Sequence, residues 1–243
     1  MFALYKKELQ AFFYSPFAYV LSALFMLIFS FGFITSIADL SSTALKFSFP
    51  EFFYNNFFYF IFIIPLLTMR SFADERRGGT EVLLLSSPLS VWQIVLAKFL
   101  AITTVFLFMI ALSMFFPIYT AASGTVMWSS LICAYCGFFL WGLVCIAVGM
   151  LLSSLTGNAI ISAIIGEIVM EGLLFLDQFG ATKLVSAYPH LNSVVTWFSM
   201  QRRFIYFSQG MFRLEDLIFF LSAAAVVLIW NILSIEQRRW SHH

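Results

Sequence analysis

Charged side chains gather in residues 70–98, a short stretch that lies between two long apolar segments of the chain. The stretch carries seven of the 25 formal charges in the sequence, which has 13 basic and 12 acidic residues. Ionised groups of both signs offer charge-assisted hydrogen bonds to a protein partner. The first hypothesis is therefore a partner-facing cytoplasmic loop that carries Arg70, Asp74, Glu75, Arg76, Arg77, Glu81 and Lys98.

A second chemically suggestive pair is Glu167 and Glu171, which lie in an otherwise apolar stretch of the chain. Their spacing of four places both carboxylates on one face of a helix. A carboxylate that faces lipid is costly. We therefore expect the pair to face a water-filled path, a dimer interface or a partner residue. A structural hydrogen bond to neighbouring helices and a position near the outer surface are the alternatives.

The cysteines and histidines favour no catalytic or metal site. Cys133 and Cys136 have the spacing of a metal or redox pair, but they lie in an apolar stretch without a nearby histidine. We expect them to be buried packing residues. His190 is the only histidine outside the terminal pair, so a Ser, His or metal constellation for an intramembrane enzyme is missing. The formal net charge of +1, with dispersed basic residues, predicts no nucleic-acid partner.

The elements that position these groups are membrane helices. The chain is 62% hydrophobic and 10% charged, with a mean hydropathy of +0.96, so it lacks the polar residues that a soluble domain of 243 residues needs. About 20 apolar residues cross a bilayer as a helix. The sequence predicts a single all-α, polytopic domain over residues 1–243 with six transmembrane helices, at 17–38, 53–70, 91–117, 128–154, 158–177 and 214–235.

The basic residues set the orientation. With six spans, eight of the 13 basic residues fall on one side, which the positive-inside rule makes cytoplasmic. Both termini are then cytoplasmic. The eight are Lys6, Lys7, Arg70, Arg76, Arg77, Lys98, Arg238 and Arg239, and the five outside are Lys46, Lys183, Arg202, Arg203 and Arg213.

Residues 1–15 form a predicted amphipathic interface helix. Phe2, Tyr5, Leu9, Phe12 and Phe13 recur at spacings of three and four, whereas the two lysines and Gln10 fall elsewhere. The helix would lie in the cytoplasmic interface before Pro16 lets the chain turn into the first span. A frayed extension of that span is the alternative.

Residues 71–90, which we call the coupling segment, read as a helix, a break, a short helix and a restart. Gly78 and Gly79 end the first helix, Thr80 caps a short helix over residues 81–86, and Ser90 with Gln93 forms a capping box that starts the third span. The apolar run 82–85 needs lipid or protein to cover it, which a merely solvated loop does not explain.

Residues 178–213 form a long outer segment, which we expect to be re-entrant or to fold as short interfacial helices that close the external end of a pathway. Arg202 and Arg203 would anchor it at the interface or contact lipid head groups.

At this point the coupling segment resembles the ABC transporter type-2 permease family. The residues that carry the resemblance are Glu75 to Glu81, Leu83-Leu84, Ser87-Pro88-Leu89-Ser90 and Ile94 to Phe99. The resemblance extends to Lys6-Lys7-Glu8-Leu9 with Phe12-Phe13 and Ser15-Pro16, which match the entry helix of the family. Phe207 to Gly210 with Asp216 and Phe219-Phe220 resembles the approach to the last span, and this pattern is similar to that of the six-span permeases of gliding-motility and copper-enzyme-maturation operons. Gln209 departs from the pattern, because those relatives often have a basic residue there.

The resemblance implies a permease subunit of the inner membrane that dimerises, as a homodimer or a heterodimer, and exports a substrate. An ABC ATP-binding subunit would hold ATP and Mg, and this sequence contains no phosphate loop and predicts no cofactor bound directly. The interface helix and the cytoplasmic coupling helix between spans 2 and 3 would transmit closure of that subunit. The implied coupling residues are Glu75, Arg76, Arg77, Thr80, Glu81 and Leu84.

In related permeases spans 2 and 5 line the translocation route, which implies a substrate path at Glu167 and Glu171. Membrane lipid is a further expected partner, and an auxiliary periplasmic or membrane subunit is left open. The competing hypothesis is a proton-coupled secondary transporter in which Glu167 and Glu171 carry protons. The absence of an apparent inverted repeat in the sequence weakens it.

Overall fold

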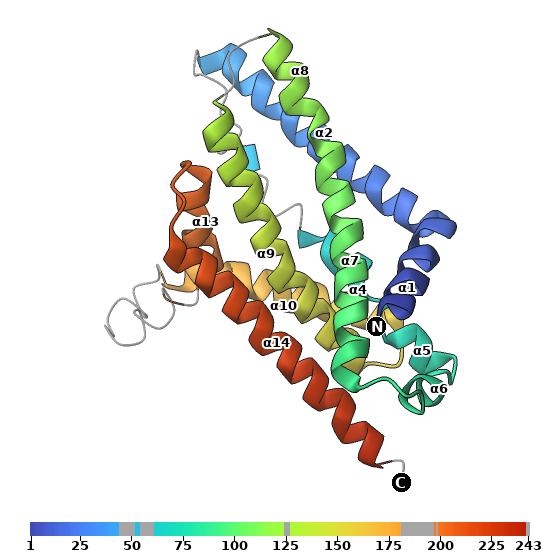
Figure 1. Ribbon diagram of the computed structural model, residues 1–243. Helices are drawn as coiled ribbons and strands as arrows, with labels where there is room; N and C mark the ends of the chain where they lie inside the picture. Colours follow the sequence, from blue (N-terminus) through green and yellow to red (C-terminus); the bar gives the residue numbers. More distant parts are fainter. Residues whose placement is uncertain (44–51, 54–60, 124–126, 181–196, 198, 242–243) are drawn as a thin grey trace.

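The computed structural model describes residues 1–43, 52–53, 61–123, 127–180, 197 and 199–241. Regular structure within these ranges is α-helical (Figure 1), which confirms the all-α class. Four of the described helices are long and apolar enough to cross a membrane, namely Pro16–Ile37, Val91–Ala122, Trp128–Leu155 and Leu214–Arg238. The chain is thus a polytopic membrane protein. Six spans remain a prediction, because residues 54–60 of the second lie outside the described residues and the helix at the fifth is not among the four.

The helices follow the predicted order with somewhat different bounds. In chain order they are α1 (Phe2–Tyr14), α2 (Pro16–Thr43), α4 (Ile63–Thr68), α5 (Ala73–Arg77), α6 (Glu81–Leu85), α7 (Val91–Ser113), α8 (Phe115–Ser123), α9 (Trp128–Leu155), α10 (Ala159–Gly180), α13 (Met200–Ser208) and α14 (Leu214–Ser241).

Pro117 interrupts the third span but does not end it, which corrects the predicted end of this span at residue 117. The α7 helix ends at Ser113 and α8 begins at Phe115, so the helix is broken at Met114. A proline ring clashes with the carbonyl group four residues earlier, which for Pro117 is that of Ser113, and this clash explains the position of the break. The two helices together make one apolar stretch, Val91–Ala122.

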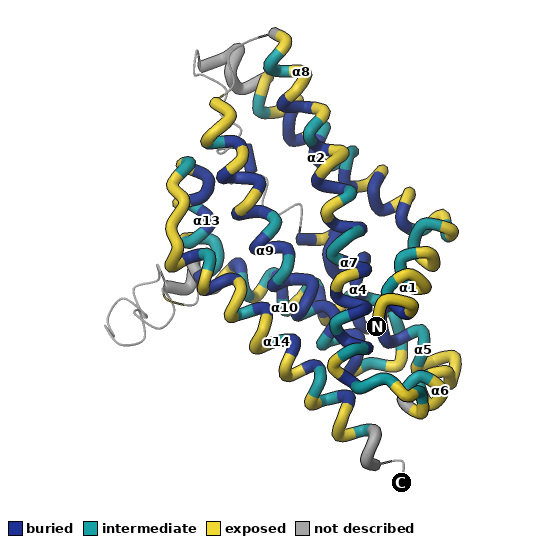
Figure 2. Tube along the Cα trace, in the orientation of Figure 1, coloured by how far each residue is buried: buried dark blue, intermediate teal, exposed yellow. Residues whose placement is uncertain are grey.

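The α9 helix is the centre of the bundle and contacts α4, α7, α10, α13 and α14. Its apolar window is also the most buried of the four candidate spans (Figure 2). Glycines make this close packing possible, because a Cβ atom would overlap the neighbouring side chain at each of three positions. Gly137 lies under Phe207 of α13, Gly142 under Phe106 of α7, and Gly149 under Thr68 of α4. Small residues at helix contacts allow such close approach of the backbones.

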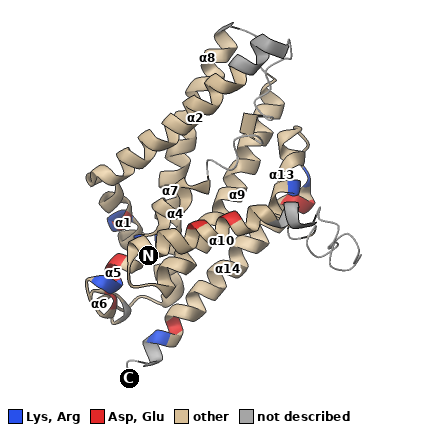
Figure 3. Ribbon diagram, turned by 180° about the vertical axis from the view of Figure 1, so that it is seen from behind, with Lys and Arg blue, Asp and Glu red and all other residues tan. Residues whose placement is uncertain are grey.

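The coupling segment and both chain termini lie at one end of the bundle (Figure 1). Coloured by charge, the same end shows basic and acidic residues on α1, α5, α6 and the end of α14 (Figure 3). An ion pair of 3.6 Å between Arg238 and Glu81 ties α14 to α6 there. The α13 helix lies beside the start of α14, at the end of α14 that is far from the coupling segment (Figure 1). We call these two regions the coupling end and the α13 end.

Candidate functional site

The coupling segment has the predicted sequence of helix, break and helix. The α5 helix ends at Arg77, and Gly79 adopts a φ of 68° that few residues other than glycine tolerate. The turn is held by two backbone hydrogen bonds of 2.9 Å, from the Gly78 N–H to the Asp74 carbonyl and from the Thr80 N–H to the Glu75 carbonyl. The two short helices are therefore joined by an ordered turn.

Thr80 does not cap α6 with its side chain, which corrects the expectation from the sequence. Its hydroxyl instead donates a hydrogen bond of 3.3 Å back to the Glu75 carbonyl, so it closes the turn behind the helix. Ser90 does precede the first residue of α7, and its N–H donates to the side-chain oxygen of Gln93 at 3.3 Å. In a capping box, the side chain of the third helical residue, here Gln93, accepts a hydrogen bond from the backbone N–H of the residue before the helix, here Ser90.

Ser153 of α9 fixes the start of the coupling segment to the centre of the bundle. Its hydroxyl accepts hydrogen bonds of 3.2 Å from the N–H groups of Phe72 and Ala73, and donates one of 2.9 Å to the carbonyl of Met69. Arg76 adds a hydrogen bond of 3.2 Å to the carbonyl of Leu155. Ser153 is not among the residues predicted from the sequence, although a serine near the end of a long apolar span indicates a possible polar contact.

Lys98 of α7 forms the electrostatic centre of the coupling end. Only 2% of its side chain is exposed, and its ammonium group lies 2.8 Å from Glu75 of α5 and 3.0 Å from Glu8 of α1. The ammonium group also lies 5.3 Å from the centre of the Phe72 ring. A single buried lysine therefore binds the interface helix, the coupling segment and the third span together. The sequence analysis places Lys98 in the partner-facing loop on the cytoplasmic side, whereas the structure buries it within the chain.

Glu75 consequently points inward. Burial raises the pKa of its carboxyl group, and Lys98 opposes that effect through its charge and its hydrogen bond. The second oxygen of Glu75 is buried and finds no hydrogen-bond partner within the described part of the chain. Two carboxylates share one ammonium group, so the cluster carries an excess of one negative charge when all three groups are ionised.

The opposite side of the coupling segment faces outward. Arg76, Arg77 and Thr80 are exposed, and the apolar side chains of Val82 and Leu83 are 59% and 72% exposed. We call Arg77, Thr80, Val82 and Leu83 the docking patch. Leu84 instead packs against the core, and Glu81 is half-buried in its ion pair with Arg238. Of the six predicted coupling residues, Arg76, Arg77 and Thr80 are thus exposed, whereas Glu75, Glu81 and Leu84 are partly buried.

The α1 helix lays its apolar face on α7. Leu4 is buried, the Tyr5 hydroxyl lies 3.0 Å from the Thr104 hydroxyl, and the rings of Phe13 and Phe108 meet edge to face with centroids 5.5 Å apart. The lysines predicted on its polar face are exposed. Much of the apolar face therefore has a protein partner, in addition to any contact with the membrane interface.

The α10 helix carries Glu167 and Glu171 along the boundary of two surfaces. Its buried side packs on α4 and α9, with the Gly166 backbone against Pro65. Its exposed side is apolar and includes Ile160, Ile164 and Ile168. By helical geometry Glu171 lies among the isoleucines and Glu167 between them and the buried side. One oxygen of Glu167 is buried without a hydrogen-bond partner in the described ranges.

At the α13 end, Arg203 makes internal contacts. Its guanidinium group lies 2.9 Å from Asp216, which is 3% exposed, and 3.9 Å from the centre of the Phe219 ring. It also donates to the Trp197 carbonyl at 3.1 Å. Arg203 thereby ties α13 to α14, whereas Arg202 is exposed. Residues 181–196 and 198 of the predicted outer segment lie outside the described residues.

The expectation that both cysteines of the CxxC spacing are buried is confirmed for Cys133 and wrong for Cys136, which is exposed. Within the described ranges, no three His, Cys, Asp or Glu side chains gather as metal ligands.

Comparison with known proteins identifies the family. The sequence pattern of the family described as ABC-2 family transporter protein matches residues 36–235, which is well over half of the chain and includes the whole coupling segment. Neither the curated proteins nor the solved structures yield a match. The predicted family is confirmed: the chain belongs to the ABC-2 family of transporter permeases.

Proposed function

We propose that this permease exports its substrate across the inner membrane, driven by ATP hydrolysis in a separate ATP-binding subunit that docks on the coupling segment. Two permease chains and their ATP-binding subunits would form the transporter. The observation that carries the proposal is the two-sided coupling segment. One side is fixed by Lys98, Ser153 and Arg238, whereas the other presents an arginine and two exposed apolar side chains.

The chemistry of the docking patch fits a protein partner. Val82 and Leu83 are apolar and exposed at the end of the bundle that carries most of the charges, where membrane lipid tails would not cover them. Arg77 stands two residues before Gly79 and offers a guanidinium group for a carboxylate of the partner. Arginine is among the residue types enriched at the energetic centres of protein interfaces, and the exposed apolar pair would exclude water around it.

The fixed side gives a route for force. Movement of the docked subunit would displace α5 and α6, and the Lys98 cluster would carry α1 and α7 with them. The α10 helix contacts both α4 and α5, so the same displacement would reach Glu167 and Glu171. We include both carboxylates in the proposed substrate path, with the coupling segment and both termini on the cytoplasmic side.

Co-purification tests the docking proposal. The full-length chain is captured from its native membranes, and the bound ATP-binding subunit is identified by its phosphate-loop sequence and its ATP hydrolysis. Leu83→Ser should lower its recovery about tenfold, since a lost apolar anchor costs an interface more than 1 kcal/mol. Recovery that is unchanged in Leu83→Ser and in a combined variant with Arg77→Ser would overturn the proposal.

The matched control is Met211→Ser, because Met211 is also an exposed apolar residue in a short connection but lies at the α13 end. It should leave recovery unchanged. The control is needed because a serine substitution on an exposed apolar residue can alter detergent binding in general. Single substitutions are used because replacing the whole of residues 75–81 with a Gly/Ser linker would also remove the contact of Glu75 with Lys98.

Glu167→Gln tests the substrate path. In proteoliposomes that contain the whole transporter, ATP-dependent movement of lipids, hydrophobic peptides and organic cations is first screened to find a substrate. The variant should then slow transport at least about tenfold with assembly and basal ATP hydrolysis retained, as expected for loss of a specific polar contact. Unaltered transport would remove Glu167 from the path.

The proton-coupled alternative predicts transport driven by a pH gradient without ATP. Membership of the ABC-2 family favours the ATP-driven mechanism. Transport by the chain alone in response to a pH gradient would reverse that preference.

A further inference from the structure

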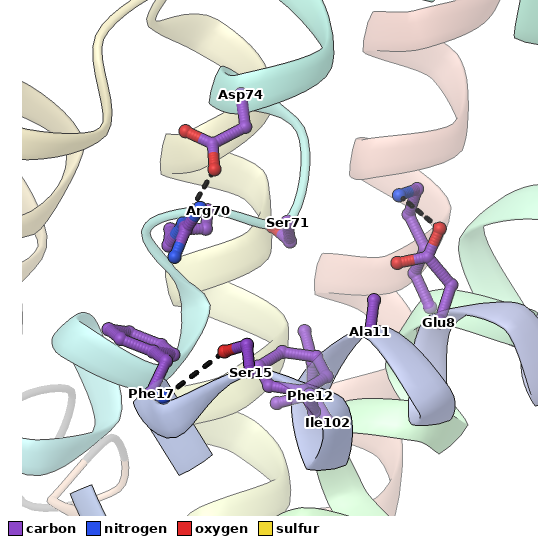
Figure 4. Close-up of a pocket in the computed structure, with 10 residues that line it drawn as sticks. Glu8, Ala11, Phe12, Ser15, Phe17, Arg70, Ser71, Asp74 and Ile102 are labelled. Atoms are coloured by element: carbon purple, nitrogen blue, oxygen red, sulfur yellow. Dashed lines mark hydrogen bonds and ion pairs between the residues drawn. The ribbon is translucent and has the colours of Figure 1, made fainter. Parts of the chain in front are cut away.

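A pocket lies beside the corner where α1 turns into α2, and the coupling segment forms its opposite wall. Its cavity volume is about 140 Å³. Figure 4 shows Ser71 between the Arg70–Asp74 pair and Glu8, with Ser15 and Phe17 on the neighbouring corner. The lining therefore combines ionised groups of both signs with aromatic side chains.

Two buried polar groups in this pocket have unused hydrogen-bonding capacity. Ser71 is 6% exposed, and its hydroxyl has no hydrogen-bond partner in the described part of the chain. Lys98 is 2% exposed and also lines the pocket. Its ammonium group has three N–H donors, of which Glu8 and Glu75 take two. Buried polar groups normally find partners, so both groups indicate a ligand.

The charges of the lining select the kind of ligand. Arg70 and Lys98 supply two positive charges and Glu8 and Asp74 supply two negative charges, and Glu75, which shares Lys98 with Glu8, adds a third negative charge. A ligand with one negative group alone would therefore be repelled by the carboxylates at least as much as it is attracted by the cations. A zwitterion with an ammonium group and a phosphate group satisfies both signs. Arg70 and Ser71 would bind the phosphate, and Glu8 and Asp74 the ammonium group.

The position of the pocket selects a lipid as the source. The candidate span of α2 begins at Pro16, so the corner at Ser15 marks the membrane surface. Phe12 and Phe17 line the pocket at this corner and offer apolar contact to the start of an acyl chain. Arg70 also lies 5.2 Å from the centre of the Phe17 ring, which places the cation beside that apolar wall.

We propose that this pocket binds the head group of a phospholipid that carries a primary ammonium group, of the phosphatidylethanolamine class. A choline head group cannot donate hydrogen bonds to Glu8 and Asp74, because its nitrogen carries no hydrogen. A glycerol head group has no positive charge for them. The inference concerns lipid recognition by this chain and does not depend on ATP-driven export.

Native mass spectrometry of the full-length, delipidated chain tests the proposal. Phosphatidylethanolamine, phosphatidylcholine and phosphatidylglycerol with identical acyl chains are titrated separately, and free phosphoethanolamine forms a fourth series. Phosphatidylethanolamine should bind about tenfold more tightly than the other two lipids, which corresponds to one or two charge-assisted hydrogen bonds. Free phosphoethanolamine should bind far more weakly, because it lacks the acyl chains.

Two alanines of α1 provide a matched pair of variants. Both Ala3 and Ala11 are exposed, but only Ala11 lines the pocket. Ala11→Trp should fill the pocket and abolish the preference for ethanolamine, whereas Ala3→Trp should leave it unchanged. Ser71→Ala removes only the unpartnered hydroxyl and should weaken the preference, which keeps the test decisive where Ala11→Trp does not fold.

The proposal is overturned by equal binding of the three lipids, or by a preference that survives both Ala11→Trp and Ser71→Ala. Binding of free phosphoethanolamine as tight as that of the lipid overturns the lipid assignment and indicates a soluble ligand. Recovery of the ATP-binding subunit in Leu83→Ser tests the docking proposal alone, and lipid preference tests the pocket alone. Either proposal can therefore fail while the other holds.

Discussion

The two ends of the bundle each contain a buried ion pair, but the pairs are built differently. At the α13 end, Arg203 pairs with one carboxylate, Asp216, and also contacts the Trp197 carbonyl and the Phe219 ring. At the coupling end, Lys98 serves two carboxylates from two different helices. The first arrangement is balanced in charge and joins two helices that are neighbours in the chain. The second is short of positive charge and joins three separate elements.

This difference indicates different tasks. A balanced pair within one helical corner fixes a local shape, as a structural clamp does. A lysine shared by α1, α5 and α7 makes the positions of these elements interdependent, as a unit that transmits docking must be. The following variants test this contrast, from the largest expected effect to the smallest.

Lys98→Met should be the most damaging single change. It leaves Glu8 and Glu75 without their cation in a mostly buried place, where loss of one partner costs about 3–5 kcal/mol. The measurement is the free energy of unfolding in a bilayer-like environment. Adding Glu8→Gln and Glu75→Gln to Lys98→Met should restore much of the stability, because no buried charge is then left unpaired. Failure of the triple variant to recover would contradict the electrostatic account.

Asp216→Asn should cost less, about 1–3 kcal/mol. The amide oxygen can still accept a hydrogen bond from Arg203, which also retains the Trp197 carbonyl and the aromatic rings. The same unfolding measurement should rank it between Lys98→Met and the exposed pairs. A loss as large as that of Lys98→Met would remove the distinction between the two ends.

The pH dependence of stability should differ between the ends as well. Burial raises the pKa of Glu75 above its ordinary value of 4.5, so the folded chain holds this proton more tightly than the unfolded chain does. The Glu75 contribution to stability is therefore fully present below pH 4.5 and is lost as the pH rises through the raised pKa. Glu75→Gln should flatten that part of the curve of unfolding free energy against pH, whereas Asp216→Asn should leave the Glu75-dependent slope in place. An unchanged slope in Glu75→Gln would contradict the burial of this carboxyl group.

The exposed ion pairs should contribute least at both ends. Arg70 with Asp74 at the coupling end and Arg213 with Glu215 at the α13 end are substantially exposed. Such pairs are worth less than about 1 kcal/mol each. Arg70→Gln and Arg213→Gln should therefore change the unfolding free energy by similar small amounts. A large loss in Arg70→Gln alone would show that the coupling end depends on its surface pairs rather than on Lys98.

Much of this arrangement could be predicted from local sequence. The Gly78-Gly79 break, the start of α7 after Ser90 and the amphipathic pattern of residues 2–14 depend on neighbouring residues, and the helices begin and end close to the predicted positions. The family likewise followed from short motifs.

The pairing of distant residues could not be predicted in the same way. Lys98 lies 90 positions from Glu8 and 23 from Glu75, and Ser153 lies 80 positions from Ala73. Only the packing of α1 and α5 against α7, and of α5 against α9, brings them together. The inward direction of Glu75 also depends on a distant residue, namely the buried Lys98. The sequence around a charged loop residue does not indicate whether its side chain faces solvent or a buried lysine.

Site-specific photocrosslinking tests the central claim most directly, namely that the outward side of the coupling segment contacts the ATP-binding subunit. A photoreactive amino acid is placed at Leu83, and in a separate variant at Met211, in the full-length chain in native membranes. The account predicts a crosslink from position 83 to the ATP-binding subunit and none from position 211. Crosslinks from position 211 but not from position 83, or equal crosslinks from both, would contradict it.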